Sequence, residues 1–167
     1  MMPQFAVAEA GIRQLHARYA EAVWRKDLQC FGDCFAEQAE WRIAGMVLKG
    51  RAEIVEAFAG IIADARRVFM SFETPILSIE GTSRASGRTM VSEQSRWLDG
   101  RTNLMLGRYF EHFVHEEGRW RFGWRLYQVL YTGPHDLSGT YYDEPNFGPP
   151  PAMPPRDAVP AATRRPA

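Results

Sequence analysis

Hydrophobic residues recur at helical spacing in the first third of the chain. The first apolar stripe consists of Ile12, Leu15, Tyr19 and Val23. The second stripe consists of Leu28, Phe31 and Phe35. It follows Asp27, a residue type that favours the N-cap position of a helix. A third stripe runs from Arg51 to the pair Arg66 and Arg67. Because this spacing places apolar residues on one face of a helix, the pattern predicts three amphipathic helices.

A hairpin and a series of strands accompany the predicted helices. Two apolar runs on either side of Gly45 predict a hairpin over residues 40–50, between the second and third helices. The pattern becomes typical of strands after Val68, and the expected strands are residues 70–79, 85–98, 101–115 and 119–131. Turn residues separate them at 80–83, 99–100 and 116–118. Helices followed by a meander of strands predict an α+β domain, with one face of the sheet covered by helices.

Composition agrees with one domain and excludes some classes of partner. The chain has 167 residues, of which 46% are hydrophobic, so it can bury one substantial core. Twenty basic and twenty acidic residues cancel, so no overall charge recruits nucleic acid or an anionic membrane. No stretch approaches the roughly 20 apolar residues of a membrane span. Cys30 and Cys34, four apart on a predicted helix, are expected to be buried reduced thiols, so we expect a cytoplasmic protein.

The composition changes after Gly133, because eight of the eleven prolines follow Glu144. Proline removes backbone donors and disfavours regular structure. We therefore expect a domain at residues 1–135 and a proline-rich extension at 136–167 that is partly disordered or packed on the domain or on a partner subunit. The aromatic residues Tyr141, Tyr142 and Phe147 favour packing for the segment from residue 137 to residue 147.

Several short motifs occur in a recognisable order between about residues 10 and 132. They are Arg18-Tyr19-Ala20, Cys34-Phe35-Ala36, Ala39-Glu40-Trp41, Lys49-Gly50-Arg51, Glu53-Ile54, Gly107-Arg108-Tyr109 and Gly118-Arg119-Trp120-Arg121-Phe122. In combination, they resemble the SnoaL-like branch of the NTF2-like superfamily, which includes scytalone-dehydratase-like and polyketide-cyclase-like proteins. The resemblance implies a strongly curved antiparallel sheet that forms a cone around three N-terminal helices.

The resemblance also implies an apolar pocket at the open end of the cone. Catalytic relatives often place there an Asp from the first helix and a His from the first long strand. In this chain, Trp24 and Met70 occupy these two positions, and neither can replace the missing acid–base groups. They would make the pocket better suited to an aromatic or polycyclic ligand. The alternative is that they fill the cone and leave no cavity.

Other residues must then transfer protons if the pocket is catalytic. The candidate catalytic residues are Tyr19, Glu73, Tyr109, Glu111 and His112. Tyr109 and Glu111 would share one face of a strand, with His112 on the other. Burial in a dry pocket would raise the pKa of Glu111 and make it a base, whereas the alternative places Glu111 at the surface. The residues expected to bind substrate are Trp24, Trp41, Met70, Phe72 and Trp124.

Metal, cofactor and nucleic-acid sites are not predicted. His112 and His115 are three apart and would lie on opposite faces of a strand, while His16 and His135 have no ligand cluster nearby in sequence. Trp120, Phe122 and Trp124 alternate with arginines, which favours a half-buried strand over an RNA-binding platform. Glycine-rich phosphate loops and nucleophile elbows do not occur either.

The hypothesis favoured by the resemblance is a cofactor-independent lyase or isomerase, dehydratase-like, acting on a hydrophobic aromatic, polyketide-like or steroid-like molecule. Two alternatives stay open. A non-catalytic protein that binds a small hydrophobic ligand would need no acid–base pair, and a small assembly subunit of a ring-hydroxylating oxygenase would bind a larger partner. We further expect a homodimer formed through the outer face of the sheet.

Overall fold

The computed structural model describes residues 2–142 of the chain, as three helices and eight strands. The helices are α1 (Met2–Arg25), α2 (Leu28–Asp33) and α3 (Arg51–Ile62). The strands are β1 (Phe35–Ile43), β2 (Met46–Lys49), β3 (Ala65–Phe72), β4 (Ile76–Glu80), β5 (Arg84–Trp97), β6 (Thr102–Glu116), β7 (Arg119–Gly133) and β8 (Thr140–Tyr141). None of the described helices has the length and apolar character needed to cross a membrane.

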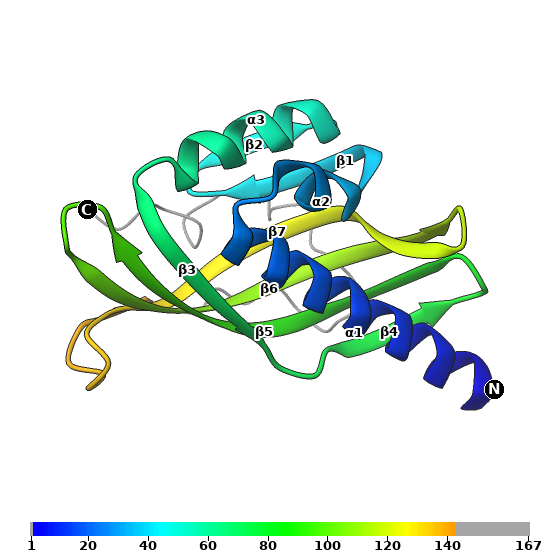
Figure 1. Cartoon of the computed structure of the whole chain (residues 1–167). Coiled ribbons are helices and arrows are strands. Elements are labelled where there is room, and N and C mark those ends of the chain that lie inside the picture. The colour runs from blue at the N-terminus through cyan, green and yellow to red at the C-terminus, as the bar shows by residue number, and fades with distance from the viewer. Residues whose placement is uncertain (1, 143–167) are drawn as a thin grey trace.

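All eight strands belong to one curved sheet. The order along it is β2-β1-β7-β6-β5-β3, with β4 paired to β5 and β8 paired to β7. Figure 1 shows α1 lying across the inner face of this sheet, while α3 lies beside β1 and β2. The predicted α+β class and curved sheet are confirmed. The predicted sheet was antiparallel throughout, but β1 and β7 run parallel.

The first helix forms as its apolar pattern predicts. Its stripe is buried against the sheet and comprises Ile12, Leu15, Tyr19 and Val23. Asp27 caps α2, because its Oδ1 accepts a hydrogen bond from the backbone N–H of Cys30 at 2.9 Å. This helix ends at Asp33, so Phe35 begins β1 instead of continuing the helix. Cys34 is buried, but Cys30 is exposed, so the expectation that both thiols are buried was wrong for Cys30.

Two predicted boundaries differ from the structure. The third helix ends at Ile62, earlier than predicted, because Arg66 and Arg67 already belong to β3. The strand expected over residues 70–79 is divided into β3 and β4, with Pro75 in the break, since proline has no N–H to donate to a ladder. Both pieces pair with β5, so they act as one interrupted neighbour of that long strand.

The chain folds back onto β7 after Gly133. The backbone N–H of Gly139 donates to the Tyr131 hydroxyl at 3.0 Å, and that of Tyr142 donates to the Leu130 carbonyl at 3.0 Å. The Tyr131 and Tyr141 rings lie 4.9 Å apart. The start of the predicted extension therefore packs on the sheet. Residues 143–167, including Phe147, lie outside the described residues.

Candidate functional site

A cavity of about 680 Å³ lies between the inner face of the sheet, the C-terminal part of α1, and α3. Its apolar lining includes Val23, Trp41, Phe58, Met70, Trp97 and Met105. The polar lining includes Tyr19, Glu93, Asn103, Tyr109, Tyr127 and Thr132. A mostly apolar wall with a few polar groups is the usual composition of a small-molecule site. The cone is therefore not filled, which removes the alternative of a core without a cavity.

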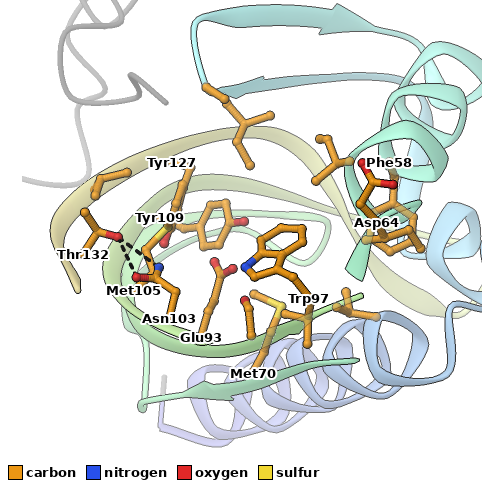
Figure 2. A pocket seen from close by; sticks show the side chains of 18 of the residues that line it. Phe58, Asp64, Met70, Glu93, Trp97, Asn103, Met105, Tyr109, Tyr127 and Thr132 are labelled. Atoms are coloured by element: carbon orange, nitrogen blue, oxygen red, sulfur yellow. Dashed lines mark hydrogen bonds between the residues drawn. The ribbon is translucent and has the colours of Figure 1, made fainter. Parts of the chain in front are cut away.

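Two carboxyl groups belong to the cavity lining, those of Asp64 and Glu93. Asp64 is exposed, whereas Glu93 is half-buried and reaches the middle of the cavity. Glu93 lies on β5, where its cross-strand neighbours are Met70 on β3 and Met105 on β6. Figure 2 shows its carboxyl group projecting into the cavity beside the Trp97 indole. Burial raises the pKa of Glu93 to about 7, although the neighbouring Tyr127 hydroxyl and the charge of Arg125 oppose the change. Such a group can both accept and release a proton near neutral pH.

Glu93 was not among the residues predicted from the sequence. A signal for it existed, because side chains alternate between the two faces of a strand. Val91, Ser95 and Trp97 lie on the inner face of β5, and Glu93 stands in the same alternating set. The resemblance implied instead that the site lies at positions 24 and 70.

Three tyrosines surround the carboxyl group. Tyr19 comes from α1, whereas Tyr109 and Tyr127 are cross-strand partners on β6 and β7. Burial raises the pKa of Tyr19 to about 12 and raises the pKa values of Tyr109 and Tyr127 well above 10. Their hydroxyls therefore stay protonated at neutral pH, and they can donate hydrogen bonds to a ligand oxygen.

Glu111 lies in a buried polar network behind the tyrosines. Thr89 Oγ1 donates to Glu111 Oε2 at 2.8 Å, and His16 Nε2 lies 3.0 Å from the same oxygen. Arg125 Nε donates to Oε1 at 2.9 Å. Burial alone would raise the pKa of Glu111, but His16, Arg125 and these hydrogen bonds outweigh it and lower the pKa to about 2. Glu111 is neither a surface residue nor a base, so both expectations for it were wrong.

Arg125 connects this network to the cavity wall. Its guanidinium lies 3.6 Å from the centre of the Tyr109 ring and 4.5 Å from that of Tyr19. Glu111 neutralises the opposite side of the guanidinium, with Nη2 2.8 Å from Oε1. A fixed positive charge thus lies directly behind two of the cavity tyrosines.

Only two of the residues expected to bind substrate line the cavity. These are Trp41 and Met70. Trp24 is 44% exposed and packs edge-on against Phe69, so the expectation that it contacts the pocket was wrong. The helical period turns it away from the Tyr19 and Val23 stripe. Trp124 lies on the outer face of the sheet, where its indole N–H donates to Glu40.

Phe72 packs on the His16 ring, with the two centres 4.8 Å apart, and it does not line the cavity. Among the expected catalytic residues, Tyr19 and Tyr109 lie in the cavity wall. Glu73 is exposed in the break between β3 and β4. His112 is exposed on the outer face beside Trp124, so neither residue belongs to this site. Within residues 2–142, no group of three or more His, Cys, Asp or Glu side chains could hold a metal ion.

The sequence of this chain matches a known family. The SnoaL-like domain model matches residues 5–125, most of the chain. The chain belongs to the SnoaL-like family. No curated protein matches it significantly.

Several solved structures share this SnoaL-like fold. A candidate scytalone dehydratase from Novosphingobium aromaticivorans DSM 12444 is 19% identical, with a TM-score of 0.76 over 84% of this chain and 96% of that chain. The type 2 hexachlorocyclohexane dehydrochlorinase LinA is 16% identical, with a TM-score of 0.73 over 87% and 99%. The β subunit of a candidate aromatic-ring-hydroxylating dioxygenase from the first organism is 14% identical, with a TM-score of 0.65 over 74% and 90%. At these identities, the similarity establishes the fold alone.

Proposed function

We propose that this protein is a cofactor-independent lyase or isomerase, in which Glu93 transfers a proton within a neutral hydrophobic substrate. The observation that carries the proposal is the Glu93 carboxyl group, which projects into a largely apolar cavity among tyrosine hydroxyls. The dehydratase and dehydrochlorinase named above support elimination chemistry on this fold by analogy.

The proton transfer follows from the arrangement of the side chains. The Glu93 carboxylate removes a proton from a carbon next to a substrate carbonyl, and the C–H electron pair forms a carbon–carbon double bond. The carbonyl electron pair moves onto oxygen, where a tyrosine hydroxyl donates a hydrogen bond to the developing anion. In an isomerase, the Glu93 carboxyl returns the proton to another carbon. In a lyase, the electrons expel a leaving group, which takes up the proton.

The surroundings of Glu93 suit it to both halves of this cycle. Burial holds its pKa close to 7, so the carboxylate and the protonated acid are both populated at neutral pH. Glu111, in contrast, stays ionised and bound to Arg125. The half-buried Glu93 and the fully buried Glu111 lie on the same face of the sheet, and their different partners give them separate roles.

Deuterium exchange tests the proposal without knowledge of the natural substrate. The α-protons of 1-tetralone, a neutral ketone of suitable size, can be followed by NMR in D2O. Wild-type protein should accelerate the exchange, and Glu93→Gln should abolish the acceleration while binding of the ketone persists. The matched control is Glu73→Gln, which changes an exposed glutamate outside the cavity. Equal exchange rates with wild type and Glu93→Gln would contradict the proposal.

A non-catalytic ligand-binding protein is the second candidate. Trp24 and Met70 occupy the positions of the family's acid–base residues, and they favour this alternative. Trp24 lies outside the cavity and Met70 contributes only apolar surface, so neither can transfer a proton to a ligand there. Under this alternative, 1-tetralone would bind, but its exchange rate would equal that in buffer.

The dioxygenase β subunit named above favours a third candidate, an assembly subunit. Such a protein would bind a larger catalytic chain through exposed surface. Its cavity variants would leave assembly unchanged, whereas the enzyme hypothesis makes those variants decisive for activity.

A further inference from the structure

Within residues 2–142, no basic side chain forms a salt bridge with the Glu93 carboxylate. The charge of Arg125 influences the pKa of Glu93, but its Nη2 lies 2.8 Å from Glu111 Oε1 and is paired there. The neighbouring Tyr127 hydroxyl is uncharged at neutral pH, because burial raises its pKa well above 10. A half-buried carboxylate without a counter-ion carries a desolvation cost that a cationic ligand would offset.

Aromatic rings line the cavity around this carboxylate. They belong to Tyr19, Trp41, Phe58, Trp97, Tyr109 and Tyr127. Figure 2 shows the Trp97 indole beside the Glu93 carboxyl group. The face of an aromatic ring attracts a cation, tryptophan most strongly, and the attraction grows when the cation is removed from water. A carboxylate beside aromatic rings is therefore suited to an organic ammonium ion.

The cavity also offers apolar surface on both sides of the carboxylate. Met70 and Met105 are the cross-strand neighbours of Glu93 on β3 and β6, and both line the cavity. Their thioethers are polarisable and pack well on aromatic groups. A volume of about 680 Å³ is in the range of small-molecule sites. A ligand that matches this cavity therefore has a charged nitrogen and an apolar, preferably aromatic, body.

The other charged groups at the cavity do not oppose a cation. Its charged lining residues are Asp64, Glu93 and Arg101. Arg101 is paired with Asp99, with Nε 2.7 Å from Oδ2. Arg125 lies behind the wall, 3.6 Å from the centre of the Tyr109 ring, and Glu111 neutralises it. Because Arg125 already covers one side of that ring, Trp97 is the better contact for a ligand cation.

We propose that this cavity binds a hydrophobic ammonium compound, with its nitrogen between the Glu93 carboxylate and the Trp97 ring and its apolar body against Met70 and Met105. The inference goes beyond the proposed function, because binding requires the carboxylate as a counter-ion and involves no proton transfer. A bound cation would compete with the neutral substrate for the same cavity.

Two probes of equal shape test the role of the charge. Trimethyl(2-phenylethyl)ammonium and (3,3-dimethylbutyl)benzene differ in the replacement of the charged nitrogen by carbon. Their affinities can be measured at pH 8 by quenching of intrinsic tryptophan fluorescence. Glu93→Gln should weaken binding of the cation by about tenfold or more and should not weaken binding of the hydrocarbon, which also reports that the cavity is intact.

The matched control is Glu73→Gln, which removes a negative charge at an exposed position outside the cavity. It should leave both affinities unchanged. An equal loss of cation affinity in Glu73→Gln and Glu93→Gln would show a general effect of net charge and would overturn the proposal. Unchanged cation affinity in Glu93→Gln would overturn it too.

The pH dependence gives a second test, because a quaternary nitrogen keeps its charge at every pH. Glu93 has a pKa of about 7, so cation affinity for wild-type protein should rise by about tenfold from pH 6 to pH 8. Burial keeps the tyrosines protonated over this range, while Glu111 stays ionised. His16 and Asp64 are retained in Glu93→Gln, so the rise should be absent from that variant. A flat profile in wild type would contradict the proposal.

Trp97→Leu tests the aromatic contact. It should lower the ratio of cation affinity to hydrocarbon affinity by about 2- to 5-fold. An unchanged ratio would overturn the placement of the nitrogen against this ring. If Glu93→Gln does not fold, the wild-type pH profile and Trp97→Leu still decide the matter.

These measurements require no turnover, so the two proposals can fail separately. Glu93-dependent binding of the cation without accelerated exchange of 1-tetralone would refute the catalytic role alone. Accelerated exchange without Glu93-dependent binding of the cation would refute only this inference.

Discussion

The Glu111 carboxylate is locked to the Arg125 guanidinium, with both side chains fully buried. Arg125 Nε donates to Glu111 Oε1 at 2.9 Å, and Nη2 lies 2.8 Å from the same oxygen. Thr89 and His16 occupy the other oxygen. The Glu111 carboxylate thus has a structural role, which is why we propose Glu93, and not Glu111, as the proton-transfer group of the cavity.

Breaking this pair should strongly destabilise the protein. Glu111→Gln keeps the shape of the side chain but leaves the Arg125 charge buried without its partner. We expect a loss of about 3–5 kcal/mol in the free energy of unfolding, measured by urea denaturation. Glu73→Gln, at an exposed position, should change it by less than about 0.5 kcal/mol.

The same pair makes the protein sensitive to acid. The pKa of Glu111 is about 2 in the folded state against an ordinary 4.5, so its stabilising contribution is complete above pH 4.5. It is lost as the pH falls toward 2. A loss of stability equal in wild type and in Glu111→Gln over this window would contradict the network.

Glu93 should have the opposite effect on stability. Its pKa is about 7 in the folded protein, whereas an unfolded glutamate releases its proton near 4.5. The folded state therefore binds more protons between these values, and stability falls as the pH rises through them. Glu93→Gln should raise the Tm above pH 7, with a smaller difference below pH 4.5. A Tm difference that does not vary with pH would argue against the raised pKa.

Met70 and Trp24 should differ in their effect on ligand binding. Met70 lines the cavity, so Met70→Leu should change the affinity for 1-tetralone while preserving side-chain volume. Trp24 lies outside, so Trp24→Phe should leave that affinity unchanged. Isothermal titration calorimetry compares them directly, and an affinity change confined to Trp24→Phe would place the binding site elsewhere.

A homodimer through the outer face of the sheet stays a prediction. The exposed apolar side chains on the outer face of β3, β4 and β5 are Phe69, Ile76 and Met90. Covering them would remove apolar surface from water. Light scattering should give about twice the chain mass of 19.0 kDa, and Phe69→Lys should reduce it toward the monomer. A monomer mass at every concentration would exclude this interface.

Much of the fold could be predicted because the local spacing of apolar residues indicates the helices and strands. The stripe from Ile12 to Val23 and the turns at Gly45, Gly81, Gly100 and Gly118 mark the elements from short-range pattern alone. The break at Pro75 and the early end of α3 could not be predicted in this way. Both follow from the pairing of β3 and β4 with the same strand, β5, and the periodicity of a local segment carries no information on strand pairing.

The site was harder to predict because its chemistry depends on distant partners. Glu111 and Glu93 are both glutamates on inner faces of strands, yet their pKa values move in opposite directions. The difference comes from Arg125 and His16, far from Glu111 in sequence. Trp24 illustrates another limit, since its family position suggested a pocket role that the helix orientation does not support.

The most direct measurement is the titration of Glu93 itself. Protein labelled with 13C at the glutamate carboxyl carbons can be followed by NMR across pH, with the Glu93 signal assigned from its absence in Glu93→Gln. A carboxyl group poised for proton transfer in the cavity should titrate with a midpoint near pH 7. A midpoint near the ordinary value of 4.5 would contradict the role assigned to Glu93.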